Sequence, residues 1–117
     1  MSLEDIRKRI VAFREARDWG QFHNAKDLAV SLSLEASEVL ELFQWKKSLE
    51  EIEQTVKDKK EQLSEEVADV LLYLINLCDV ADIDLEEAAL SKLDKNENKY
   101  PINKAKSNAK KYNEFKE

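Results

Sequence analysis

Apolar residues recur three and four positions apart along most of the chain, which is the period of an amphipathic α-helix. The first such stretch predicts a helix from about Leu3 to Asp18, and its apolar face consists of Leu3, Ile6, Ile10, Val11 and Phe13. Asn24 is suited to cap a second helix, with Asp27 in its first turn, and the apolar pattern carries this helix to about Lys46.

Two further helix starts are marked by polar residues. Ser48 followed by Glu51 is a capping-box pattern, and the helical stretch that it opens extends to about Ala81. Its polar segment, residues 55–62, fits either a bend or continuous helix. Asp84 begins a last helix that ends near residues 96–98, before Pro101, and residues 102–117 form a polar, lysine-rich tail.

Composition supports an all-α fold, because the 117 residues include only one Gly and one Pro. This length suits a single domain spanning residues 1–117. The net charge of −6 argues against duplex nucleic acid as a partner. No signal peptide opens the chain and no apolar run reaches the ~18 residues of a membrane span, so we expect a cytoplasmic protein without a membrane partner. Cys78 lies in an apolar run and is expected to be a buried, inert thiol.

Four acidic residues interrupt the apolar faces of two helices. On a helical wheel Glu35 lies inside the apolar arc of the second helix, and Glu38 lies at its edge. Glu66 and Asp69 take the equivalent places in the next helix, whereas Asp79 falls on the face assigned to solvent. This helix is apolar nearly all round, which is typical of the centre of a bundle.

Each acidic pair is spaced i, i+3, so both carboxylates of a pair can bind one ion from the same side. Burying unpaired charges is costly, and divalent cations would offset that cost. Oxygen ligands favour Mg²⁺, or Mn²⁺, over zinc. A di-iron bundle would need Glu-x-x-His motifs, but the one histidine, His23, lies outside both pairs. The alternative is that these acids are solvated or paired with lysines.

The segments "LEASEVLELFQW" and "EEVADVLLYL" resemble the E-x-x-E … E-x-x-D signature of the MazG-like all-α nucleotide pyrophosphohydrolases. The segments "RDWGQFH", "ELFQW" and "SKLDKNENKYP" are similar to those of its dCTP pyrophosphatase branch. The broader family often has a second acid where this chain has Leu34. Members of the dCTP branch also lack this acid, so its absence is interpreted as a character of that branch. Some relatives have a histidine where Ile10 stands, which leaves base or sugar selectivity open.

The resemblance implies Mg²⁺-dependent hydrolysis of a nucleoside triphosphate, dCTP or a modified dCTP, to the monophosphate and diphosphate in nucleotide-pool clean-up. The implied metal ligands and catalytic acids are Glu35, Glu38, Glu66 and Asp69. The positions that match the nucleotide pocket are Trp19, His23, Trp45 and Tyr73. The terminal motif, which approaches the phosphates in such proteins, often from a neighbouring subunit, contains Lys92, Asn96, Lys99 and Tyr100.

A chain of this length with an apolar central helix leaves that helix incompletely covered. We therefore expect an antiparallel four-helix-bundle-type core completed by oligomerisation, as a homodimer or homotetramer. Two alternatives to a dCTP pyrophosphatase are the same chemistry on dUTP or a broad range of triphosphates, and a non-enzymatic helical assembly module whose acids are inert. The proton acceptor is one of the four acids or the neighbouring Glu41.

Overall fold

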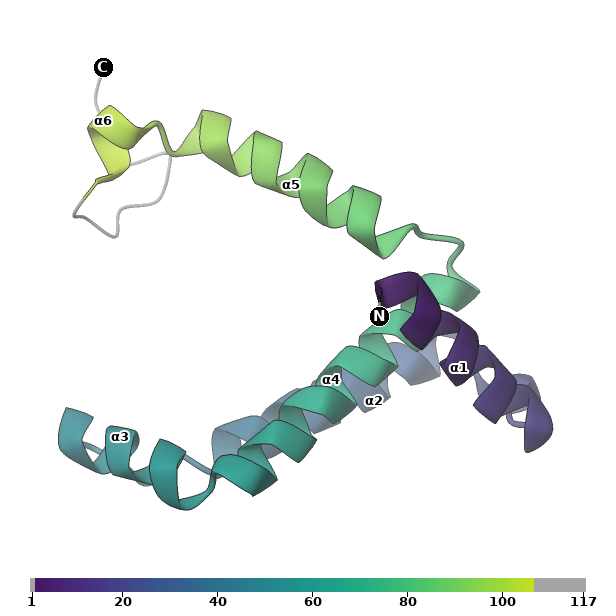
Figure 1. Cartoon of the computed structure of the whole chain (residues 1–117), viewed down its shortest axis with the longest axis horizontal. Coiled ribbons are helices and arrows are strands. Elements are labelled where there is room, and N and C mark those ends of the chain that lie inside the picture. The colour runs from purple at the N-terminus through teal and green to yellow at the C-terminus, as the bar shows by residue number, and fades with distance from the viewer. Residues whose placement is uncertain (1, 107–117) are drawn as a thin grey trace. The chain divides into compact units, whose positions relative to one another are not determined.

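The computed structural model describes residues 2–106, and every regular element in this range is a helix, which confirms the all-α prediction. In chain order the elements are α1 (Leu3–Ala16), the 3₁₀ turn η1 (Gly20–Phe22), α2 (Ala25–Glu41), α3 (Leu49–Asp58), α4 (Lys60–Val80), α5 (Leu85–Lys99) and α6 (Ile102–Ala105) (Figure 1). The chain divides into two compact units, Met1–Ile83 and Asp84–Glu117. The prediction of a single domain remains a prediction.

Side-chain caps set the helix starts, as the sequence predicted. The side chains of Asn24, Ser48 and Asp84 each accept a hydrogen bond from the backbone N–H three residues later. These bonds satisfy donors that the first helical turn leaves unpaired. The same holds at Ser2, where a full capping box opens α1.

The end of the second helix differs from its prediction, and the structure decides between the two alternatives left open for residues 55–62. Helix α2 ends at Glu41, not near Lys46, because the chain tightens into i→i−3 bonds from Phe43 to Leu40 (2.9 Å) and from Lys46 to Phe43 (2.9 Å). The stretch after Ser48 is interrupted at Lys59, whose φ of −113° and ψ of 21° separate α3 from α4. The polar segment 55–62 therefore contains a break.

In the first unit, α2 and α4 run side by side and antiparallel (Figure 1). Leu28 of α2 and Ile75 and Cys78 of α4 are the buried apolar residues among those described. Cys78 is thus buried as predicted, and burial raises the pKa of its thiol. Phe13, predicted for the buried face of α1, is half exposed, and the Arg17 guanidinium lies 3.6 Å from its ring centroid.

Helix α1 packs on α4 through an ion-pair network. Asp79 accepts hydrogen bonds from Arg7 Nη1 and Arg14 Nη2, both at 2.8 Å. The prediction that Asp79 faces solvent is therefore wrong, because α1 covers that face of α4. Burial alone would raise the pKa of Asp79, but the hydrogen bonds from both arginines lower it overall.

The second unit begins with the Asp84 cap of α5. This helix continues to Lys99, slightly beyond the predicted end, and Pro101 caps the short helix α6. Residues 107–117 of the predicted tail lie outside the described residues. Within residues 2–106, no helix combines the length and the apolar character that crossing a bilayer requires.

Candidate functional site

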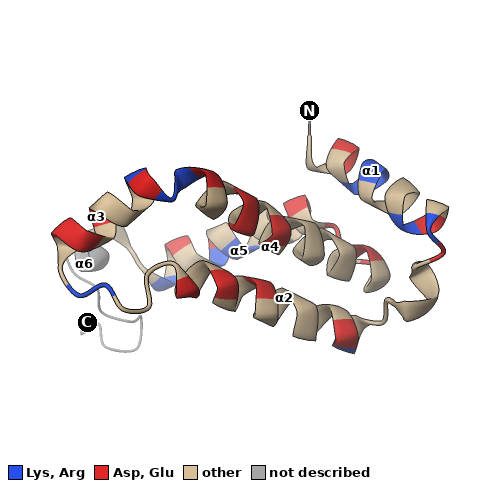
Figure 2. Cartoon of the chain, turned by 90° about the horizontal axis from the view of Figure 1, so that it is seen from below, with Lys and Arg blue, Asp and Glu red and all other residues tan. Residues whose placement is uncertain are grey.

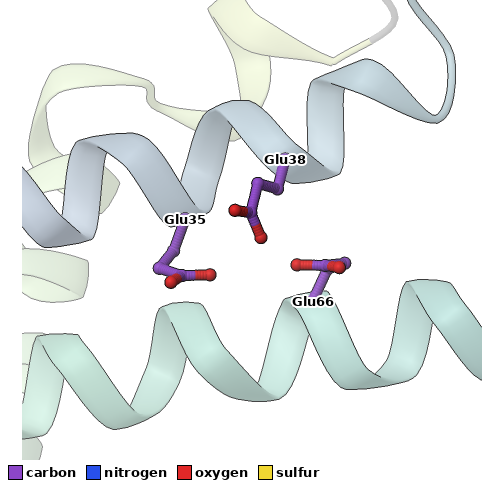
Figure 3. Close-up of side chains that lie close together, drawn as sticks. All are labelled: Glu35, Glu38 and Glu66. Atoms are coloured by element: carbon purple, nitrogen blue, oxygen red, sulfur yellow. The ribbon is translucent and has the colours of Figure 1, made fainter.

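Three carboxylates meet between α2 and α4. Glu35 and Glu38 project from α2 towards Glu66 of α4 (Figure 3). One oxygen of each residue lies within 4.8 Å of the other two. The i, i+3 spacing places both glutamates on one patch of α2, and the antiparallel pairing of the helices brings Glu66 opposite them. Figure 2 shows acidic positions on both helices where they run side by side.

The electrostatics of this carboxylate cluster are unfavourable without a cation. Oε2 of Glu35 and Oε2 of Glu66 are buried and have no hydrogen-bond partner. Burial, followed by the negative charge of Glu38, raises the pKa of Glu35. Hydrogen bonding with Glu38, together with burial and the neighbouring acids, raises the pKa of Glu66 to about 7. Each cause disfavours the ionised form, so the site as folded favours a bound positive charge.

This donor set fits a hard divalent cation. The cluster contains only carboxylate oxygens, with no His or Cys among the grouped side chains, and two of those oxygens are buried without partners. Oxygen-only sites suit Mg²⁺ and Mn²⁺. Glu35, Glu38 and Glu66 would hold such an ion.

Asp69, the fourth predicted acid, is not part of this cluster. It is exposed and lies one turn after Glu66 on α4. Its charge nevertheless contributes to the raised pKa values of Glu35 and Glu66. Its side chain borders the neighbouring cavity, so it connects the cluster with that cavity.

A largely apolar cavity of about 510 Å³ lies beside Asp69, between α1, the η1 connection and α4. Trp19 borders it and packs edge-on against Phe13, with ring centroids 5.6 Å apart. His23 Nδ1 is buried there without a hydrogen-bond partner. The residues that line the cavity are Ile6, Arg9, Ile10, Phe13, Arg14, Trp19, His23, Asp69, Leu72, Tyr73 and Asn76.

Three of the four predicted pocket residues, Trp19, His23 and Tyr73, thus meet at one cavity. Trp45 does not join them. It is 79% exposed in the turn after α2, because the helix that was expected to carry it ends at Glu41. It borders instead a second, more polar cavity of about 670 Å³ that also contacts Glu38, Glu66 and the side chains of Lys46 and Lys59.

The predicted phosphate-binding residues belong to the second unit. Lys92, Asn96 and Lys99 lie on α5, and Tyr100 is its C-terminal cap. Their role at the site stays a prediction.

Sequence reasoning missed Arg14 as a cavity residue. Arg14 Nη1 donates to Asn76 Oδ1 at 3.3 Å, and both side chains line the apolar cavity. The spacing offered a signal, because Arg14 stands four residues after Ile10 and therefore on the same face of α1. An arginine at such a position is usually assigned to solvent, and only the α1–α4 packing reveals its partner.

The structure is therefore that of an all-α protein. Its antiparallel helices α2 and α4 hold a carboxylate cluster that could bind a metal ion, beside a cavity of ligand size. The model of the MazG-like family matches residues 30–115. dCTP pyrophosphatase 1 of Homo sapiens is 42% identical over 115 residues, which cover 97% of this chain and 68% of that protein. The Rattus norvegicus protein of the same name is 40% identical with the same coverage.

A solved structure agrees with these sequence relatives. The crystal structure of a pyrophosphatase from Archaeoglobus fulgidus DSM 4304 is similar to this chain with a TM-score of 0.81 and 46% sequence identity. The match covers 84% of this chain and 91% of that one. The chain belongs to the MazG-like family.

Proposed function

We propose that this protein is a Mg²⁺-dependent nucleoside triphosphate pyrophosphatase that converts a triphosphate and water into the monophosphate and diphosphate. The observation that carries the proposal is the cluster of Glu35, Glu38 and Glu66 beside a cavity large enough for a nucleoside. The relatives named dCTP pyrophosphatase 1 support this reaction class and make dCTP or a modified dCTP the first substrate to test. A role in nucleotide-pool clean-up follows from that chemistry.

The carboxylate cluster and a triphosphate are both negatively charged, so they repel each other unless a cation lies between the carboxylates and the phosphates. Mg²⁺ held by Glu35, Glu38 and Glu66 would neutralise charge on the phosphoryl oxygens and lower the pKa of a bound water. Asp69, which lines the apolar cavity, would complete the ligand set once a substrate is present. A carboxylate of this group, or Glu41 one turn further along α2, accepts the proton of the attacking water.

The two cavities suit the two ends of a nucleotide. Trp19, His23 and Tyr73 line the apolar cavity, where a base can stack on an aromatic ring and be shielded from water. The polar cavity is lined by Lys46 and Lys59 and also by four acids, Glu38, Glu41, Asp58 and Glu66. With a cation on the carboxylates, the two ammonium groups would contact the diphosphate end. The nucleotide would therefore bind with its base towards α1 and its phosphates towards α3.

Completion of the site by a second copy of the chain is part of the proposal. Leu34 and Leu40 of α2 are 60% and 62% exposed in one chain, which suits a homodimer or homotetramer. The terminal-motif residues Lys92, Asn96, Lys99 and Tyr100 would then contact phosphates.

A panel of deoxy- and ribonucleoside triphosphates, assayed with and without Mg²⁺ for monophosphate and diphosphate, tests the function. We expect activity only with the metal, and we expect Glu38→Gln to lower kcat/KM by at least about 10- to 100-fold. Glu65→Gln is the matched control, because Glu65 precedes Glu66 on α4 and lies outside the cluster. Release of orthophosphate, or equal activity of both variants, would contradict the proposal.

The same panel separates the alternatives. Comparable turnover of dUTP, dCTP and ribonucleotides would favour a broad-range enzyme. A helical assembly module would hydrolyse none of them, and Mg²⁺ would not change its melting temperature.

A further inference from the structure

Asn76 places a side-chain amide in the wall of the apolar cavity, and two contacts fix which way round this amide lies. Arg14 Nη1 donates to Asn76 Oδ1 at 3.3 Å, and an arginine side chain can only donate. Asn76 Nδ2 donates to the backbone oxygen of Leu72 at 3.2 Å, and a carbonyl oxygen can only accept. A reversed amide would meet a donor with its N–H₂ group and an acceptor with its oxygen, so the observed orientation is strongly preferred.

Arg14, which orients the amide, is itself held in place. Its side chain is only 11% exposed, and its Nη2 donates to Asp79 Oδ2 at 2.8 Å. The other carboxylate oxygen of Asp79 accepts a hydrogen bond from Arg7 Nη1 at 2.8 Å. The ion-pair network between α1 and α4 therefore fixes the guanidinium group against which Asn76 rests.

The amide of Asn76 keeps one acceptor and one donor position for a ligand. An amide oxygen has two lone pairs, and Arg14 occupies one of them. The N–H₂ group has two hydrogens, and Leu72 accepts one of them. The free lone pair and the free hydrogen match two neighbouring groups of cytosine, the 4-amino group, which donates, and ring N3, which accepts. Uracil has the reverse pattern, because its 4-oxo group accepts and its N3–H donates.

Other polar side chains of the cavity wall are less able to distinguish these two bases. The Tyr73 hydroxyl can rotate and therefore either donate or accept. A neutral His23 can exchange its tautomer, because its buried Nδ1 has no hydrogen-bond partner within residues 2–106 to fix the proton. Both groups can thus adapt to a 4-amino or a 4-oxo group, whereas the fixed amide of Asn76 cannot.

The position of Asn76 along α4 determines which part of a nucleotide it meets. Asn76 lies seven residues after Asp69, which is ~10 Å along the helix axis. With the phosphates at the carboxylate cluster, the sugar lies beside Asp69 and Tyr73. Position 4 of a pyrimidine lies opposite the N1 atom that joins the ring to the sugar, so it is the part of the base farthest from the phosphates. This far edge of the base reaches Asn76.

We infer that Asn76, oriented by Arg14 and Leu72, is a specificity-determining residue that selects cytosine over uracil. The inference rests on the proposed function, which makes dCTP the first substrate to test but assigns no residue to the choice of base. With cytosine, Oδ1 accepts from the 4-amino group and Nδ2 donates to N3. With uracil, the 4-oxo group would face Oδ1 and N3–H would face the N–H₂ group. Polar groups left unpaired inside a cavity are a strong basis for rejecting a ligand.

The test compares kcat/KM for dCTP and dUTP in the wild type and three variants. The wild type should prefer dCTP, and Asn76→Leu should lower the dCTP/dUTP ratio about ten-fold or more, because leucine has a similar shape and no polar side-chain atom. Arg14→Met should also lower the ratio, because the amide can then reverse. Arg7 is the matched control, since it pairs with Asp79 but does not line the cavity. Arg7→Met should leave the ratio within about two-fold.

Four results would overturn the inference. Three of them are a wild type without preference for dCTP, an unchanged ratio in Asn76→Leu, and an equal change in Arg7→Met and Arg14→Met. The fourth is a ratio that rises in Arg14→Met, because the guanidinium itself would then be the group that favours a 4-oxo base. If circular dichroism shows that Asn76→Leu does not fold, Asn76→Ala replaces it, since alanine also removes the amide.

Calorimetric binding of dCMP and dUMP to the same variants gives a readout without turnover. Selective dCMP binding that depends on Asn76 in a protein without hydrolase activity would overturn the proposed function alone. Hydrolysis with a dCTP/dUTP ratio that does not depend on Asn76 would overturn this inference alone.

Discussion

At the scale of single residues, the most informative signal was a carboxylate inside an apolar stripe. The wheel position of Glu35 predicted an inward-facing acid, and its Oε2 is indeed buried without a partner. Glu38 and Glu66 also meet it as the spacing predicted. Asp69 was harder to place, because i, i+3 spacing fixes a shared helix patch but leaves the direction of each side chain to local rotamers and neighbours.

The pKa of Glu66, raised to about 7 by its neighbours, leads to a prediction about stability. In the folded protein without metal this carboxyl binds a proton more tightly than in the unfolded chain, so its protonation stabilises the fold below about pH 7 and that stability is lost as the pH rises through 7. Thermal melts should therefore show the metal-free protein gaining melting temperature as the pH falls from about 8 to about 5, relative to Glu66→Gln.

Saturating Mg²⁺ should remove this gain, because the ion binds the ionised carboxylates and protons compete with it. Calorimetry in buffers of different ionisation enthalpy would detect the protons released on binding. A melting curve that has the same pH dependence in the wild type and Glu66→Gln would contradict the assignment.

At the scale of secondary-structure elements, caps could be predicted, whereas the sequence left a bend and a continuous helix equally open for residues 55–62. Asn24, Ser48 and Asp84 mark helix starts by side-chain chemistry that is local in sequence. The break at Lys59 has no comparable signal, since its surroundings are good helix formers without Gly or Pro. Thr55, four residues before the break, is buried, and its backbone oxygen accepts a hydrogen bond from the Lys59 N–H at 2.9 Å.

The docking of α1 on α4 depends on Asp79, and its removal tests this helix pair. Asp79→Ala leaves Arg7 and Arg14, whose side chain is 11% exposed, without their shared carboxylate. We therefore expect a loss of about 1–3 kcal/mol in the free energy of unfolding, measured by urea denaturation. Asp82→Asn is the control, because Asp82 is exposed and its φ of 55° suits Asn equally. Equal stability of the two variants would show that α1 is held by apolar contacts instead.

At the scale of the whole molecule, one chain offers little apolar burial. Among the described residues, Leu28, Ile75 and Cys78 are the buried apolar side chains, whereas Val30 and Leu34 of α2 and Val67 of α4 are at least half exposed. Within the first unit, α1, α2 and α3 contact α4, and apolar side chains of α2 and α4 stay exposed. The apolar pattern of the sequence predicted that one chain would leave apolar surface exposed. Which surface covers it depends on long-range contacts, and the spacing of apolar residues does not specify these.

A second copy of the chain is the covering surface that we predict. Size-exclusion chromatography with light scattering should give a mass at least twice the 13.6 kDa of one chain, with a melting temperature that rises with protein concentration. Leu34→Glu places a charge on the exposed apolar face of α2 and should shift the protein towards monomer, because an unpaired charge is costly in an apolar interface. Lys57→Glu on the exposed face of α3 should not. A monomer at every concentration would mean that α2 and α4 are covered within one chain.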